Sequence, residues 1–114
     1  MTHSPTQITG FKWEARAEAW LRSKGLEPVT RNFRCKTGEI DLIMQDGDTL
    51  VFVEVKYRRT DLFASPLEQI TPAKQRKLRR TAEFYLQRLA SQPPCRFDVV
   101  SFTSDTPEWI QNAF

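Results

Sequence analysis

The chain has 114 residues, of which 39% are hydrophobic and 27% are charged, with a formal net charge of +3, as in many water-soluble globular domains. No apolar run reaches the roughly 18 residues of a membrane-spanning helix, and residues 1–10 lack the features of a secretory signal, so we expect a cytoplasmic protein. The only histidine is His3, which excludes histidine-based catalytic triads, and the two cysteines lack metal-binding spacing and should be reduced thiols.

The N-terminal half of the chain predicts a helix followed by three strands. Residues 1–9 are expected to be a flexible tail, and residues 11–24 have apolar side chains at helical spacing, with Gly25 as a natural end of the helix. Three segments then have the composition of strands: 28–34, 39–44 and 49–57. The last two should form a hairpin, because Asp46-Gly47 between them is a strong turn signal.

The next part of the chain predicts a loop and a second helix. Residues 59–70 show no periodicity and are expected to form the loop. Thr71 is typical of a helix N-cap and Pro72 of the first helical position, and Pro93-Pro94 should end the helix.

The C-terminal part completes the sheet. Residues 96–102 predict a strand, and buried Asp98 in this strand should be structural, with Arg96 or a backbone amide as its partner. Residues 108–114 predict either a short last strand or a packed tail. The order of elements predicts a single α/β domain over residues 1–114, with a mixed central β-sheet built on an antiparallel hairpin and flanked by helices.

The predicted hairpin carries charges that a buried sheet should reject. Because side chains alternate across a strand, one face is apolar apart from one phenol and contains Ile40, Leu42, Met44, Val51, Val53, Val55 and Tyr57. The other face contains Glu39, Asp41, Ile43, Leu50, Phe52, Glu54 and Lys56. An even-numbered turn would pair Asp41 with Phe52 and Glu39 with Glu54, and would leave Asp41 and Glu54 as diagonal neighbours, about 7–8 Å apart at the backbone.

This charge pattern favours a metal site. Facing carboxylates destabilise a sheet unless a cation lies between them, and magnesium prefers carboxylate, water and phosphate oxygens as ligands. Such an ion can activate water for attack on a phosphodiester, and Lys56 would hold the water or neutralise the phosphate. The structural alternative is a salt-bridge cluster at a strand end.

A basic cluster suits a phosphate backbone and makes nucleic acid, most simply DNA, the expected partner. Its members are Arg58, Arg59, Lys74, Arg76, Lys77, Arg79 and Arg80. The alternative is a solvated helix face.

Several motifs resemble those of known nucleases. Asp41 followed by "EVK" at residues 54–56 resembles the PD-(D/E)xK signature. From about Glu14 to Phe114 the chain also resembles the YraN-like family of predicted bacterial endonucleases, through "NFRC" at 32–35, "GEIDLI" at 38–43, "VFVEVKYR" at 51–58, "PLEQITPAK" at 66–74 and "RFDVV" at 96–100.

The resemblance implies a restriction-endonuclease-like fold, kinship with Holliday-junction resolvases, and hydrolysis of DNA with Mg²⁺ or Mn²⁺ as cofactor, including branched recombination or repair intermediates. It implies that Asp41 and Glu54 bind the metal and that Lys56 serves the water or the phosphate. Glu14 would join them from the first helix as a further metal ligand. Trp13 stands where the family usually has glycine, so its bulk is expected to crowd the helix beside Glu14.

Two other functions stay open at this point. The chain could be a non-catalytic nucleic-acid-binding module of a repair or recombination complex, although a pure binder has no need of clustered carboxylates. It could also be a protein-interaction domain, if Trp13, Trp20 or Trp109 were exposed. A homodimer is expected if the substrate is a branched junction.

Overall fold

The computed structural model describes residues 5–58 and 69–114, and for residues 5–11 it describes only the helical backbone. Its elements in chain order are α1 (Pro5–Ser23), β1 (Glu27–Cys35), β2 (Gly38–Asp46), β3 (Thr49–Arg58), α2 (Pro72–Leu86), β4 (Cys95–Thr103) and β5 (Thr106–Ile110). The expected loop at residues 59–70 lies mostly outside the described residues. Within the described part of the chain, no helix is long and apolar enough to cross a membrane.

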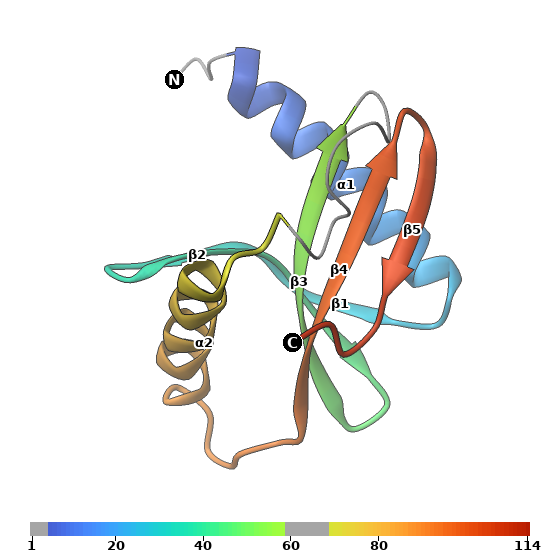
Figure 1. Ribbon diagram of the computed structural model, residues 1–114. Coiled ribbons are helices and arrows are strands. Elements are labelled where there is room, and N and C mark those ends of the chain that lie inside the picture. The colour runs from blue at the N-terminus through green and yellow to red at the C-terminus, as the bar shows by residue number, and fades with distance from the viewer. Residues whose placement is uncertain (1–4, 59–68) are drawn as a thin grey trace.

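The strands form one sheet in the order β1-β2-β3-β4-β5. Neighbouring strands are antiparallel except β3 and β4, which are parallel, and α2 lies in the connection between these two strands. α1 covers one face of the sheet and α2 covers the other (Figure 1). The prediction of an α/β domain with a mixed, helix-flanked sheet is confirmed.

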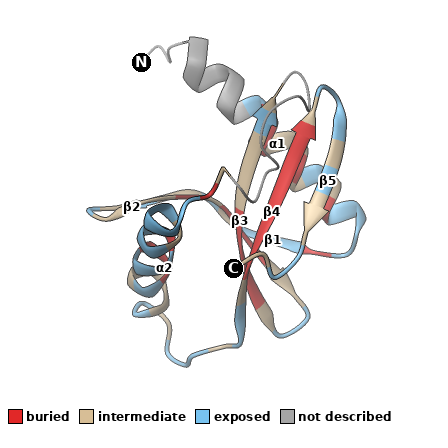
Figure 2. Cartoon of the chain, viewed as in Figure 1, coloured by how far each residue is buried: buried red, intermediate tan, exposed pale blue. Residues whose placement is uncertain are grey.

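Two hydrophobic clusters hold the helices on the sheet, and β4, between them, is buried along most of its length (Figure 2). The cluster under α1 contains Trp13, Ala17, Leu21, Leu26, Leu42, Met44, Val51, Val53, Val100 and Phe102. The cluster under α2 contains Ile40, Ile43, Leu50, Phe52, Ile70, Leu78, Ala82, Phe97 and Val99. Because both faces of the central strands are covered, β2 and β3 contain runs of consecutive buried apolar residues, at 42–44 and 50–53.

The tryptophans belong to this interior. Trp13 is only 8% exposed, and Trp20 and Trp109 are half-buried and meet edge to face, with ring centroids 6.1 Å apart. The condition for a tryptophan-based protein-interaction surface is therefore not met.

Both helices differ from the prediction at one end. α1 begins at Pro5 rather than at residue 11, so part of the segment expected as a tail is helical. α2 begins as predicted, since the Thr71 side chain accepts the Lys74 N–H at 3.2 Å and Pro72 opens the helix. α2 ends at Leu86, well before Pro93, because tighter turns in the following residues replace its hydrogen-bonding pattern.

Asp98 is structural, as predicted. It is fully buried and accepts hydrogen bonds from Arg96 Nε at 3.1 Å, Trp109 Nε1 at 2.9 Å and the Asn112 backbone N–H at 2.9 Å. The carboxylate thereby ties β4 to β5 and to the segment that follows β5.

The turn between β2 and β3 lies one residue later than predicted. Asp46 pairs with Thr49, so the two turn residues are Gly47 and Asp48. Gly47 has φ of +61°, which glycine adopts without strain, and it occupies the first turn position, as in a type II′ turn.

The later turn changes the strand register. Ile43 pairs with Phe52, so the predicted pairing of Asp41 with Phe52 and of Glu39 with Glu54 is wrong. The register moves by an even number of residues, and such a shift by itself leaves each side chain on its predicted face.

A second departure changes the faces locally at Asp41. Ile40 packs in the cluster under α2, whereas Leu42 packs under α1, so Ile40 does not share the predicted apolar face. On this side, the described β2–β3 pairing ends at Leu42 and Val53, and the Asp41 carboxylate accepts the Val55 N–H at 2.8 Å. A side chain thus replaces the backbone ladder where β2 leaves β3, and this opening positions the candidate site.

Candidate functional site

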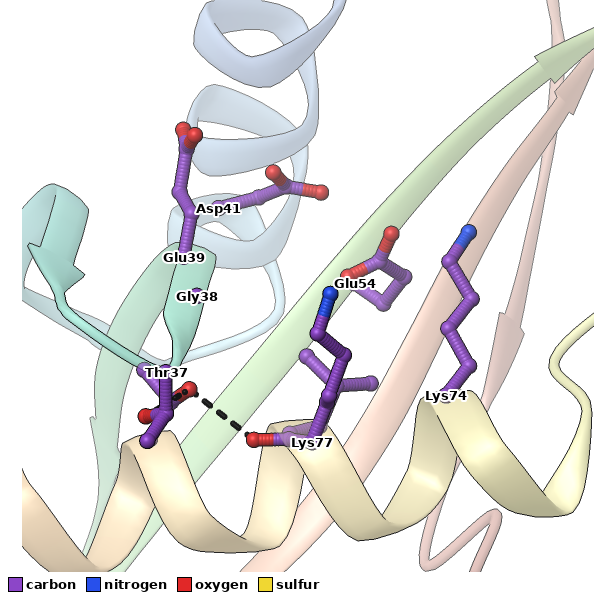
Figure 3. Close-up of a pocket in the computed structure, with 9 residues that line it drawn as sticks. Thr37, Gly38, Glu39, Asp41, Glu54, Lys74 and Lys77 are labelled. Carbon is purple, nitrogen blue, oxygen red and sulfur yellow. Dashed lines mark hydrogen bonds between the residues drawn. The ribbon is translucent and has the colours of Figure 1, made fainter.

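A pocket of about 270 Å³ lies where β2 leaves β3. Glu39, Asp41 and Glu54 line it from the strands, and Lys74 and Lys77 extend toward it from α2 (Figure 3). The fold therefore brings together Asp41 and Glu54, predicted as metal ligands, and two residues of the predicted basic cluster.

Three carboxylates lie close together at this place. One oxygen each of Glu14 on α1 and of Glu39 and Asp41 on β2 lie within 4.8 Å of one another. Glu14 is 9% exposed, and its buried Oε1 has no hydrogen-bond partner among the described residues. α1 thus places Glu14 at the site, as the resemblance implied.

Trp13 does not displace Glu14 from this cluster. Its ring stacks on Tyr57 with centroids 4.1 Å apart and contacts Phe102 at 4.9 Å. The Trp13 side chain packs into the core on the α1 side of the sheet, where a smaller residue would leave space.

Glu39 is the residue that sequence reasoning did not assign to the site. It belongs to the triad within 4.8 Å, whereas Glu54 lines the same pocket and pairs with Lys56, with Lys56 Nζ 3.3 Å from Glu54 Oε1. The available signal was its position two residues before Asp41, which places both side chains on one side of a regular strand.

The electrostatics of the site disfavour three ionised carboxylates. Burial and the nearby charge of Glu54 raise the pKa of Asp41 to about 8, against the opposing effect of the hydrogen bond from the Val55 N–H. Burial and the charge of Glu39 also raise the pKa of Glu14. Such a cluster favours the binding of a cation, which would allow the carboxylates to ionise.

Two lysines meet beside these carboxylates. Burial disfavours the charged form of Lys56, but a hydrogen bond with Lys74 and the attraction of Glu54 outweigh it and raise the pKa of Lys56. The same hydrogen bond, together with burial, lowers the pKa of Lys74. The contact therefore favours the protonated form of Lys56, next to Glu54, and disfavours that of Lys74.

The predicted basic cluster divides between different surroundings. On α2, Lys74 and Lys77 line the pocket. The guanidinium of Arg79 instead lies over the rings of Phe97 and Phe114, at 5.3 and 5.8 Å from their centroids. Its location indicates packing on the α2 side of the core rather than participation in the pocket.

The other described members of the basic cluster do not line the pocket. Arg76 and Arg80 are exposed on α2. Arg58 lines a separate hollow with Thr103, and Arg59 lies outside the described residues.

A hydrogen-bonded network that sequence reasoning missed fixes the β1–β2 turn on α2. Cys35 Sγ lies 3.1 Å from Thr37 Oγ1, which lies 3.0 Å from Thr81 Oγ1, and the Thr81 hydroxyl donates to the Lys77 carbonyl at 2.9 Å. Gly38 follows with φ of +148°, and a Cβ there would lie 3.2 Å from Thr81 Oγ1. Cys35 and Cys95 are both free thiols, as predicted.

Comparison with known proteins places the chain in a family. Residues 13–102 match the family described as "Uncharacterised protein family UPF0102". The chain is 54% identical over 115 residues to a UPF0102 protein of Cupriavidus taiwanensis, covering 99% of this chain and 88% of that protein. It is 49% identical over 108 residues to one of Aeromonas hydrophila, covering 92% and 83%. Membership of the YraN-like family is thereby confirmed, whereas kinship with nucleases stays a prediction, and the chain belongs to the uncharacterised protein family UPF0102.

Proposed function

We propose that this protein is a metal-dependent endonuclease that hydrolyses phosphodiester bonds in DNA, including branched recombination or repair intermediates. The observation that carries the proposal is the carboxylate triad of Glu14, Glu39 and Asp41, of which Glu39 and Asp41 line a pocket together with Lys74 and Lys77. Carboxylates that attract a cation beside lysines that attract an anion suit a substrate bound through its phosphate.

The donor set fits magnesium or manganese. All the candidate ligands are carboxylate oxygens, which hard divalent cations prefer, and Glu14 contributes a buried oxygen without a protein partner. Glu14, Glu39 and Asp41 would hold the ion, and Glu54 lies in the same pocket. A bound ion of this kind supplies Lewis-acid chemistry, because it makes water more acidic and offsets negative charge on phosphate.

The protein residues have separate tasks in this proposal. The Val55 N–H holds one oxygen of Asp41, which fixes the orientation of that carboxylate. Lys56, held charged beside Glu54, can donate a hydrogen bond to a phosphate oxygen or to the attacking water. Lys77 would offset phosphate charge from the α2 side of the pocket.

A non-catalytic nucleic-acid-binding module is the second candidate. The observation that favours it is the exposed pair Arg76 and Arg80, which can contact phosphate without any help from the carboxylates. A binder of this kind would gain nothing from the triad, since carboxylates without a cation repel phosphate.

The test measures DNA cleavage and DNA affinity on the same protein samples. Asp41→Asn should abolish cleavage of linear and branched DNA in Mg²⁺ or Mn²⁺, because an amide is a weaker ligand than a carboxylate. Its DNA affinity in chelator should be unchanged or slightly higher, because one negative charge is lost. Lys56→Ala should lower turnover by about a hundredfold, and much more than it lowers affinity.

The matched control is Asp48→Asn, which makes the same chemical change at an exposed residue of the β2–β3 turn and should cleave like the wild type. Metal-dependent cleavage that survives both Asp41→Asn and Lys56→Ala would show that these residues are not the active site. DNA binding without cleavage of any substrate by the wild type would favour the binding module.

A further inference from the structure

A second hollow adjoins the carboxylate pocket. It is a trough of about 430 Å³, bordered on one side by Arg34 at the end of β1 and Lys36 of the β1–β2 turn, and on the other by Lys77 of α2. Thr37, Gly38, Glu39 and Lys77 line both the trough and the pocket. The two hollows are therefore neighbours with a shared wall, and a chain-like ligand can occupy both.

The charge of the trough differs from that of the pocket. Arg34, Lys36 and Lys77 are cations, and Glu39 at the shared wall is the one acid among the described residues that line the trough. Three carboxylates line the pocket, whereas the described residues that line the trough carry a net positive charge. This order of charges suits a ligand with repeated negative groups, of which one lies over a metal site and another beside it.

Both cations on the β1 side of the trough, Arg34 and Lys36, are available to a ligand. The Arg34 side chain is 62% exposed and lies 3.3 Å from Glu39 in an exposed ion pair, a contact that contributes little stability and can rearrange. The Lys36 ammonium lies over the Phe84 ring, 5.5 Å from its centroid, and Lys36 is also exposed. Neither cation is locked in a buried salt bridge.

The trough is also held in shape before any ligand binds. Thr37 on the β1–β2 turn and Thr81 on α2 are joined through their hydroxyls at 3.0 Å, and Thr81 donates to the Lys77 carbonyl. The turn and the helix therefore keep their spacing, and a ligand pays little to order the site.

We propose that this trough binds the phosphate next to the one over the carboxylates, so that one nucleic-acid strand leaves the pocket between the β1–β2 turn and α2. Arg34 and Lys36 are then backbone-positioning residues, and the contact is independent of base sequence. The identification of the ligand as nucleic acid rests on the proposed function. The exposed Arg76 and Arg80 do not line this path.

The test is a salt titration of binding by the Arg34→Ala/Lys36→Ala double variant. Anisotropy of labelled single-stranded and duplex oligonucleotides, measured in chelator, reports binding without any contribution from metal or cleavage. We expect at least about a tenfold loss of affinity at low salt. The slope of log affinity against log salt should fall by about 1.4 for a single strand or about 1.8 for a duplex, since two phosphate contacts are lost.

Two further variants separate the trough from general charge. Arg22→Ala/Lys24→Ala removes the same number of positive charges at exposed positions near the end of α1 and should leave the slope near the wild-type value. Arg34→Lys/Lys36→Arg keeps both charges and should restore most of the binding. Thermal unfolding of each variant checks that the fold is retained.

The outcomes distinguish this inference from the nuclease proposal. If Arg34→Ala/Lys36→Ala binds with wild-type affinity and slope, the trough is not on the strand path, even if the wild type cleaves DNA. If the double variant loses binding but the wild type cleaves nothing, the inference that the trough binds nucleic acid is upheld and the nuclease proposal fails. Absence of nucleic-acid binding by the wild type would overturn both.

Discussion

We expect the carboxylate cluster to make the stability of the protein depend on pH and, through the proposed metal site, on divalent metal, and Asp41→Asn tests this dependence. An asparagine at this position can still accept the Val55 N–H through its side-chain carbonyl, so the hydrogen bond that replaces the strand ladder is kept. What changes is the negative charge beside Glu14, Glu39 and Glu54. We therefore expect the variant to be more stable than the wild type in the absence of metal.

The direction and the size of this stability change follow from the pKa of Asp41, which burial and the charge of Glu54 raise from an ordinary value of 3.8 to about 8. Between these two values the folded protein binds more protons than the unfolded chain, so its stability falls as the pH rises through this window. At about 1.4 kcal/mol for each pKa unit, the full effect has an upper limit of about 6 kcal/mol. Relaxation and water entry reduce such effects, and we expect Asp41→Asn to gain roughly 2 kcal/mol at pH 8 and about a quarter of that at pH 5.

The assay is urea unfolding of the wild type and the variant at pH 5 and pH 8, in chelator and in Mg²⁺. A cation that binds only the folded state raises the free energy of unfolding by about 2.7 kcal/mol when its concentration is 100 times its dissociation constant. Mg²⁺ should therefore stabilise the wild type more than it stabilises Asp41→Asn. The control Asp48→Asn should stay within about 0.5 kcal/mol of the wild type under every condition. If Asp41→Asn gains nothing at pH 8 in chelator, the site is not electrostatically strained and the reasoning fails.

Three further changes test separate parts of the account. Asp98→Ala should lower the free energy of unfolding by about 2–4 kcal/mol, because it leaves Arg96 and two other donors without their buried acceptor, and a loss below about 1 kcal/mol in urea unfolding would contradict this role. Gly38→Ala should cost about 1–2 kcal/mol in the same assay, because alanine at φ of +148° is strained and its Cβ would meet Thr81 Oγ1 at 3.2 Å, and wild-type stability would refute this. Glu39→Gln should weaken Mn²⁺ binding by at least about tenfold in calorimetry, and unchanged affinity would remove this residue from the site.

The sequence predicted those parts of the fold that depend on neighbouring residues. Thr71 and Pro72 marked the start of α2, because N-caps act within one helical turn. The hairpin register was missed because a two-residue turn can place Gly47 either first or second. The predicted turn placed it second, whereas the structure places it first, with Asp48 after it.

The candidate site was predictable only in part, for a related reason. Alternation along β2 and β3 indicated that Asp41 and Glu54 lie near each other, and both line the pocket. Glu39 was not assigned, because its proximity to Glu14 depends on how closely α1 approaches β2 at the point where β2 leaves β3. That distance is set by packing between residues far apart in the chain, and the local pattern indicates only that Glu39 and Asp41 share one side of the strand.

The contact between Lys56 and Lys74 could not be foreseen either. It depends on the connection between β3 and β4, which lays the start of α2 beside the end of β3. No periodic pattern in the sequence indicates which residue of the sheet a charged residue on a helix will contact. The pairing nevertheless raises the pKa of Lys56 and lowers that of Lys74.

Direct titration of Mn²⁺ into the metal-free protein tests most directly whether the carboxylate cluster is a metal site. The measurement needs no substrate, because calorimetry or the electron paramagnetic resonance of free Mn²⁺ counts bound ions. The account predicts saturable binding by the wild type and by Asp48→Asn, with affinity at least about tenfold weaker in Glu14→Gln and in Asp41→Asn. Binding of equal strength in all four proteins, or no saturable binding by the wild type, would contradict it.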